Sequence, residues 1–74
     1  MIISNGKTFG AAVKAYRKRK NATQVQLAAA ANTGARFIGD LENGKPTIQL
    51  EKALHVANVL GMKLEVLDLE GESK

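Results

Sequence analysis

The chain has 74 residues, no cysteine and one histidine, which limits it to one small domain and excludes disulfide bonds and thiolate metal sites. A domain this short buries only about 60% of the surface that its unfolded chain exposes, so self-association commonly stabilises it. No stretch approaches the roughly 20 apolar residues of a membrane span, and no secretory pattern is present. We therefore expect a cytoplasmic protein with no membrane partner and no metal.

The net charge is +4, but it is distributed unevenly. Five of the eleven basic residues lie between Lys14 and Lys20, and four of the seven acids lie in the last ten residues. This distribution suggests either that one end of the chain faces a polyanion, or that the basic segment is a solvated helix face and the acidic end a soluble tail. Charge alone does not decide between these two interpretations.

The first helix is predicted to begin after a cap at Thr8 and to end at Asn21. Within it, Phe9, Val13 and Tyr16 are spaced i, i+4 and i+7. This spacing places them in one apolar stripe, which should face the core.

The next segment, residues 23–26, has the Thr-x-x-Gln form of a capping box, so a second helix is predicted to begin there. It continues through Leu27 and four alanines, whose small side chains let a neighbouring helix approach closely. Asn32 and Gly34 then predict a short turn, because asparagine tolerates the left-handed backbone conformation and glycine is accepted as an N-cap.

A third helix is predicted over residues 35–43, with Ile38 and Leu41 on its buried face. Gly44 stands where a glycine commonly ends a helix. Two short helices joined by a three-residue turn, with small residues where they cross, indicate a helix-turn-helix over residues 23–43.

A fourth helix is predicted between a cap at Thr47 and an end at Gly61, because Pro46 prevents the third helix from continuing. Its apolar residues are spaced as one helical face. We expect five of them to point inward: Leu50, Ala53, Leu54, Ala57 and Leu60.

Apolar and polar residues alternate over residues 62–66, which predicts a half-buried strand reaching to about residue 69. Met62, Leu64 and Val66 fall on its apolar face. The segment 1–3 is too short to be a convincing partner, and an unpaired strand leaves backbone groups without hydrogen bonds. We therefore expect the strand to pair with its copy in a symmetric homodimer.

The chain resembles the Xre-type helix-turn-helix repressor family, which includes the lambdoid phage repressors. The matching residues are Thr23-Gln24, Leu27-Ala28, Ile38 and the run Leu41-Glu42-Asn43-Gly44-Lys45. The resemblance covers roughly residues 9–60. It implies a mainly α, four- to five-helix, lambda-repressor-like domain over residues 1–74 that binds double-stranded DNA at a palindromic operator. It also implies a buried ion pair between Arg17 and Glu42.

The C-terminal part, residues 45–50 and 60–66, is most similar to the HipB-like antitoxins. This resemblance implies a C-terminal β-strand pairing across the dimer, autorepression of an operon, and binding of a HipA-like serine/threonine kinase toxin. The alternatives are a stand-alone Xre-type or phage-type regulator without a toxin, or chiefly a protein-interaction module. No nucleophile–base set or phosphate-cradling glycine loop is present, so we expect no enzymatic activity, cofactor or small-molecule substrate.

In a helix-turn-helix the later helix enters the major groove, so its outward residues should read base edges. The predicted base-reading residues are Ala35, Arg36, Phe37, Gly39 and Asp40. Arg36 is the best candidate because its guanidinium can donate twice to guanine, although it could instead hold a phosphate. Gly39 either lets the backbone approach DNA closely or packs tightly against the alanine-rich second helix. Asp40 could accept from cytosine, orient Arg36 or remain solvated, and Phe37 should be partly buried.

Phosphate contacts are expected from both ends of the predicted helix-turn-helix. The predicted residues are Thr23, Gln24, Asn43, Lys45 and Thr47. The first two open the second helix, whose N-terminal amides favour an anion, although Thr23 is also a cap. The other three lie where the family grips the DNA backbone. Each phosphate neutralised should steepen the salt dependence of binding by a slope of about 0.9.

Overall fold

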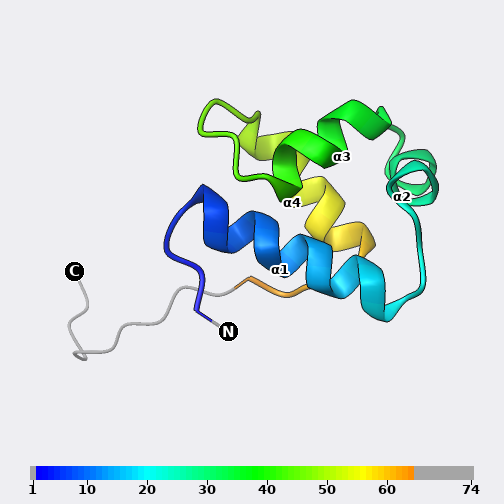
Figure 1. Cartoon of the computed structure of the whole chain (residues 1–74), viewed down its shortest axis with the longest axis horizontal. Helices are drawn as coiled ribbons and strands as arrows, with labels where there is room; N and C mark the ends of the chain where they lie inside the picture. The colour runs from blue at the N-terminus through cyan, green and yellow to red at the C-terminus, as the bar shows by residue number, and fades with distance from the viewer. Residues whose placement is uncertain (1, 65–74) are drawn as a thin grey trace.

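The computed structural model describes residues 2–64, which form four helices (Figure 1). These are α1 (Gly6–Arg19), α2 (Gln24–Ala30), α3 (Ala35–Glu42) and α4 (Leu50–Val59). α3 packs against both α1 and α2, and α4 closes the core behind them. The prediction of a mainly helical domain is confirmed. Within residues 2–64, no helix has both the length and the apolar character needed to cross a bilayer.

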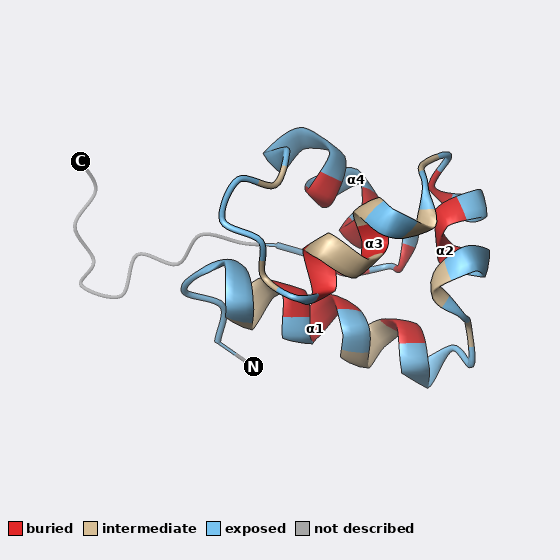
Figure 2. Ribbon diagram, turned by 45° about the horizontal axis from the view of Figure 1, so that its top comes forward, coloured by how far each residue is buried: buried red, intermediate tan, exposed pale blue. Residues whose placement is uncertain are grey.

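The hydrophobic core lies where the four helices meet (Figure 2). Its largest fully buried side chains are Val13, Ile38, Leu41 and Val56. Phe9 and Tyr16 are partly buried against this cluster and complete the predicted apolar stripe of α1. Alanines fill the narrower spaces, since Ala28 and Ala31 are buried in the α2 region.

All four helices end in the same backbone motif. The residue after each C-cap has a positive φ: Asn21 (55°), Asn32 (58°), Gly44 (79°) and Gly61 (82°). Each of these residues and its successor donate backbone hydrogen bonds of 2.9–3.2 Å into the last helical turn. Asparagine and glycine adopt this left-handed conformation at the lowest cost, so the predicted helix ends are confirmed.

The start of α1 differs from the prediction. Its N-cap is Asn5, so the helix begins at Gly6 and not after Thr8. Asn5 Oδ1 accepts from the Thr8 N–H (2.9 Å), while Thr8 Oγ1 accepts from the Asn5 N–H (3.0 Å). The prediction was wrong because Thr8 occupies the third position of a reciprocal capping box. The box predicted for α2 is present, with Thr23 and Gln26 in the two roles.

The start of α4 also differs from the prediction, because its N-cap is Gln49 and not Thr47. Pro46 and Thr47 lie in a turn in which the Ile48 N–H donates to the Lys45 carbonyl oxygen (3.2 Å). Residues in this turn are therefore unavailable to begin the helix.

The apolar face of α4 is narrower than predicted. The buried residues around it are Ala53, Val56, Ala57 and Leu60. Leu50 and Leu54, expected inside, are 64% and 41% exposed. Leu54 lies about 60° beyond Ala57 around the helix, on the side away from Val56, so it falls outside the arc of buried residues. Leu50 is in the first turn, at the edge of the packed region.

The predicted dimer strand is not formed over residues 62–64, where the described chain ends. Met62 is buried in its own chain, and its N–H donates to the Ala57 carbonyl oxygen (3.0 Å) as part of the end of α4. Leu64 is exposed. Val66 and the rest of the predicted strand lie outside the described residues, so pairing across a dimer stays a prediction.

Candidate nucleic-acid interface

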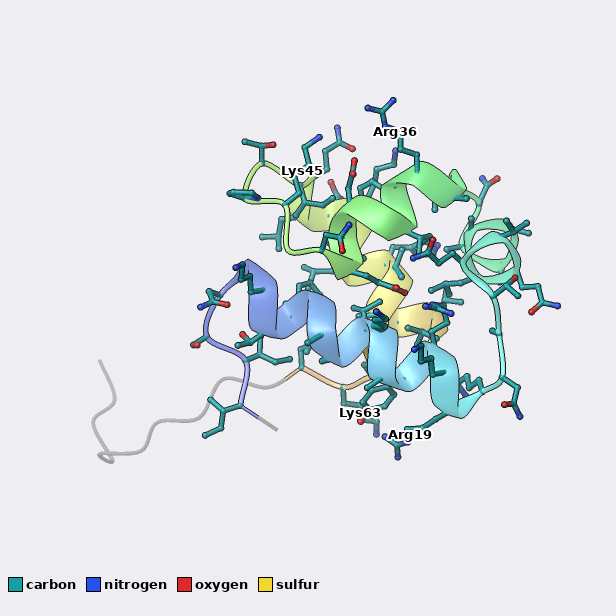
Figure 3. The ribbon with its side chains drawn as sticks, in the orientation of Figure 1. Arg19, Arg36, Lys45 and Lys63 are labelled. Atoms are coloured by element: carbon teal, nitrogen blue, oxygen red, sulfur yellow. The ribbon has the colours of Figure 1, made fainter. Side chains whose placement is uncertain are left out.

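One side of α3 faces away from the core. We call it the α3 face and define it by Arg36, Phe37, Gly39, Asp40 and Asn43. Within residues 35–40 only Ile38 is buried. Arg36 is exposed, and its side chain extends from α3 away from the other helices (Figure 3). Ala35 and Phe37 are partly buried against the core, as predicted for Phe37.

The loop after α3 adds a second cation to this side. Lys45 is exposed and extends to the same side of the molecule as Arg36 (Figure 3). Its Nζ lies 3.5 Å from Asp40 Oδ2, and within the described residues this is the ion pair that Asp40 forms. Asp40 therefore orients Lys45, whereas the sequence suggested that it could orient Arg36.

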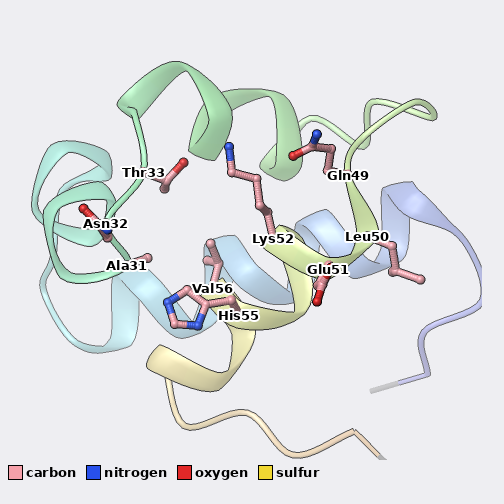
Figure 4. Close-up of a pocket in the computed structure, with 9 residues that line it drawn as sticks. All are labelled: Ala31, Asn32, Thr33, Gln49, Leu50, Glu51, Lys52, His55 and Val56. Atoms are coloured by element: carbon pink, nitrogen blue, oxygen red, sulfur yellow. The ribbon is translucent and has the colours of Figure 1, made fainter.

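A third cation, Lys52, was not singled out by the sequence. It lies in the first turn of α4, and its Nζ is 5.2 Å from the centroid of the Phe37 ring. In Figure 4 the Lys52 side chain extends toward α3, while Leu50 projects away from it. The packing of α4 alone brings Lys52 here. One feature of the sequence could have drawn attention to Lys52. It is a lysine near a helix N-terminus, where the helix dipole disfavours positive charge.

A buried ion pair fixes the position of α3. Arg17 Nε donates to Glu42 Oε2 (2.6 Å) and Arg17 Nη2 donates to Glu42 Oε1 (3.0 Å). Both residues are only 8% exposed. Gln24 Nε2 also donates to Glu42 Oε1 (3.0 Å), and Arg17 Nη1 donates to the Ala22 carbonyl oxygen (2.8 Å). These contacts tie together α1, α2, α3 and the α1–α2 connection.

The same contacts set the ionisation of the pair. Burial by itself would raise the pKa of the Glu42 carboxyl. Hydrogen bonds from Arg17 and Gln24, with attraction from Arg17 and Lys14, outweigh burial and hold this pKa below its ordinary value. The hydrogen bond to Glu42 raises the pKa of Arg17. Both side chains are therefore charged at neutral pH.

Two of the predicted phosphate-binding residues also have roles inside the fold. Thr23 Oγ1 accepts from the Gln26 N–H (3.0 Å), so it caps α2. The Gln24 side chain is committed to Glu42 through one amide hydrogen. By contrast, Asn43, Lys45 and Thr47 are exposed beside the α3 face, although Lys45 also pairs with Asp40.

The basic residues between Lys14 and Lys20 of α1 do not all lie beside the α3 face. Arg17 is buried in the ion pair, and the Arg19 guanidinium stacks over the Tyr16 ring at 4.8 Å. Arg19 and Lys63 extend on the side opposite to Arg36 and Lys45 (Figure 3). The end of the basic run is therefore a separate surface. In the described part of the chain, no group of three or more His, Asp and Glu side chains is placed to hold a metal ion.

Comparisons with known proteins agree with this geometry. The helix-turn-helix family model matches residues 13–67. An uncharacterized HTH-type transcriptional regulator, y4mF of Sinorhizobium fredii (strain NBRC 101917 / NGR234), is 48% identical over 59 residues, which are 80% of this chain and 78% of that protein. The immunity repressor protein of Bacillus phage phi105 is 35% identical over 60 residues, which are 81% of this chain but only 42% of the repressor.

A solved structure agrees in fold. The structure described as "HipB-O4 20mer complex" matches with a TM-score of 0.83 and covers 92% of this chain and 96% of that one. The sequence identity is 20%, so this likeness concerns the fold alone.

Proposed function

The chain belongs to the helix-turn-helix family of transcriptional regulators, and from this we propose that it is a repressor that binds a palindromic operator as a homodimer, with the α3 face in the major groove. The family is one of DNA-binding regulators, not of enzymes. The observation that carries the proposal is the exposed Arg36 on a helix held by the buried Arg17–Glu42 pair. A rigid helix with an outward arginine can present a fixed donor pair to a guanine edge.

The surrounding residues suit contacts with the DNA backbone. Lys45 and Lys52 flank the α3 face from the loop and from α4, and Asn43 and Thr47 add exposed polar groups. Phosphates line both rims of the major groove, so cations beside an inserted helix would meet them. At the start of α2, Gln24 would offer its backbone N–H, whereas the Thr23 N–H already donates to Gln26 Oε1 (2.8 Å).

We expect the Arg36→Ala variant to lose about 1–3 kcal/mol of operator-binding free energy per half-site, because a bidentate contact with guanine would be removed. Base preference should also relax at the position that Arg36 reads. Fluorescence anisotropy with the duplex upstream of the gene, and with single-base variants of it, measures both quantities.

Arg19→Ala is the matched control, because it removes the same charge from the side opposite to Arg36. It should change affinity far less and base preference not at all. If Arg36→Ala bound the operator as tightly as the wild type, Arg36 would have no role in reading the sequence. A loss equal for all duplexes would assign Arg36 to a phosphate instead.

The homodimer part of the proposal is supported by an apolar groove beside α1 and α4. Its apolar lining residues are Ile3, Phe9, Pro46, Ile48, Leu50, Leu54 and Leu64. The two leucines that the core leaves exposed, Leu50 and Leu54, belong to it. Leu64 is the last described residue, and the predicted dimer strand continues from it. A second copy would therefore cover the groove and pair the strand at one interface.

We expect a dimer at micromolar concentration by sedimentation velocity. Leu54→Asp should shift it toward a folded monomer, because a carboxylate in an apolar interface is costly to desolvate. Val25→Asp is the control, since Val25 is 66% exposed on α2 and lies outside the groove. A wild-type protein that sediments as a monomer would overturn the dimer.

We propose further that the protein is an antitoxin that represses its own operon and binds a HipA-like serine/threonine kinase toxin in the cytoplasm. The support is the sequence resemblance to HipB-like antitoxins, with the shared fold beside it. The similarity to a phage immunity repressor favours the second candidate, a regulator without a toxin. Purification of the tagged protein from its native source decides between them. Stable co-purification of the neighbouring gene's product would favour the antitoxin, and isolation of the protein alone would favour the regulator.

A further inference from the structure

Gly39 has no structural reason to be glycine. It lies in the interior of α3, where glycine is the poorest helix former after proline. The positive-φ glycines of the described chain are Gly44 and Gly61, so Gly39 has ordinary helical backbone. A Cβ built at Gly39 meets only Gln24 Oε1, at 3.8 Å, which is an ordinary van der Waals contact. The alternative of tight packing against α2 is therefore wrong.

Gly10 and Gly44, unlike Gly39, are glycines because neighbouring atoms leave no space for a Cβ. A Cβ at Gly10 would overlap the Leu41 carbonyl oxygen and lie 2.7 Å from that of Glu42. A Cβ at Gly44 would lie 2.7 Å from the Lys7 Cα, and its φ is positive as well. Inside the protein, Gly39 has room for a methyl group. A glycine inside a helix lowers stability, and when neither crowding nor a positive φ requires it, a functional constraint is indicated.

The position of Gly39 identifies what would need the space. It follows Arg36 by three residues, so the two lie about 60° apart around α3. It is the fifth of the eight residues of α3, and a Cβ built there would lie 3.8 Å from Gln24 Oε1 of α2. It therefore lies at the α2 edge of the α3 face, next to Arg36, within the part that the proposed function places in the groove.

We infer that a base edge, such as a thymine methyl group, contacts the main chain of α3 at Gly39, and that this glycine is a specificity-determining residue. The inference rests on the proposed function. A base edge fits better than a phosphate, because a recognition helix contacts base edges with its N-terminal residues and Gly39 lies within one turn of Arg36. Phosphates lie at the rims, nearer to Asn43 and Lys45 at the end of α3. The thymine methyl projects into the major groove and needs a gap rather than a donor.

Gly39→Ala should therefore make the protein more stable and a weaker binder. The melting temperature should rise by about 4–8 °C, because alanine favours the helix and its Cβ makes only an ordinary van der Waals contact with Gln24 Oε1. Operator affinity should fall by about tenfold or more, because the methyl group overfills the contact with the base. Base preference, measured by selection from a random duplex library, should change at one position in each half-site.

A compensated variant separates the two effects. Ala11 is exposed on α1, so Ala11→Gly should lower the melting temperature without changing DNA affinity. In the double variant Ala11→Gly/Gly39→Ala, stability should return to the wild-type level while affinity stays low. Recovery of affinity in the double variant would attribute the loss to stability and would overturn the inference.

The remaining outcomes distinguish this inference from the proposed function. If the wild type selects a preferred duplex and Gly39→Ala binds it equally well, the role of Gly39 is overturned. The proposed function as a repressor is then unaffected. An equal loss for every duplex, or a lower melting temperature, would also overturn the role of Gly39. If the wild type selects no preferred duplex, the proposed function is overturned, and this inference with it.

Discussion

Glu42→Gln should cost about 3–5 kcal/mol of unfolding free energy, because it leaves the buried Arg17 guanidinium without a counter-charge. Both side chains are nearly inaccessible, with exposed fractions of 10% for Arg17 and 2% for Glu42. An amide in place of the carboxylate would also point a nitrogen donor at the guanidinium. A core of this size rarely supplies more than about 3–5 kcal/mol, so the variant should be largely unfolded at 25 °C. Urea denaturation followed by circular dichroism measures the loss.

Two matched variants test whether the charge pair causes the effect. Gln24→Ala removes one hydrogen bond to Glu42 and leaves the ion pair intact, so it should cost only about 1 kcal/mol. Glu51→Gln neutralises an exposed carboxylate on α4 and should change stability by less than about 1 kcal/mol. The double variant Arg17→Met/Glu42→Leu should be more stable than Glu42→Gln, since it removes both charges. Equal stability of Glu42→Gln and wild type would show that the pair contributes nothing.

The pair also predicts an acid dependence of stability. The folded protein lowers the pKa of Glu42 below its ordinary value of about 4.5, so as the pH falls the unfolded chain takes up this proton first. The contribution of Glu42 is therefore fully present above pH 4.5 and is lost as the pH falls toward the lower folded pKa. The urea midpoint of the wild type should fall in that range. In the double variant Arg17→Met/Glu42→Leu, which also lacks the Glu42 carboxylate and is expected to be more stable than Glu42→Gln, this part of the decline should be absent, and an acid profile identical to that of the wild type would contradict the assignment.

Gly10→Ala should destabilise the protein by about 2–3 kcal/mol, even though alanine is the better helix former. At Gly10, α1 crosses the end of α3, and a methyl group would overlap the main-chain carbonyl groups of Leu41 and Glu42. Carbonyl groups in a helix cannot rotate aside, so α1 must move away from α3. That movement would also stretch the contact between Arg17 and Glu42. The melting temperature should fall by about 10–20 °C, measured by calorimetry.

Gly39→Ala is the matched control for this prediction. It is the same substitution, also in a helix interior, but there the added Cβ makes only an ordinary van der Waals contact with Gln24 Oε1. The two variants should therefore change the melting temperature in opposite directions. If Gly10→Ala also raised the melting temperature, the close approach of α1 to α3 would be wrong.

Much of the candidate interface was accessible from the sequence. Arg36, Asn43, Lys45 and Thr47 are exposed as a recognition helix and its following loop require, because residue spacing on a helix determines which side chains share a face. Lys52 was missed, since its approach to Phe37 depends on how α4 packs. The direction in which the basic run of α1 points could not be predicted for the same reason. Adjacent charges on a helix point in different directions, and Arg19 ends on the side opposite to Arg36.

The sequence by itself determined where the helices end, because asparagine or glycine at each end carries a backbone preference that depends on no distant contact. It did not determine where α4 begins or which of its leucines are buried. Those depend on the turn at Pro46 and on the packing of α4 against the other helices. The tertiary structure also decided the meaning of each glycine in a helix. Gly10 and Gly39 break the same local rule, and only the space around each one shows that the first serves the core and the second faces outward.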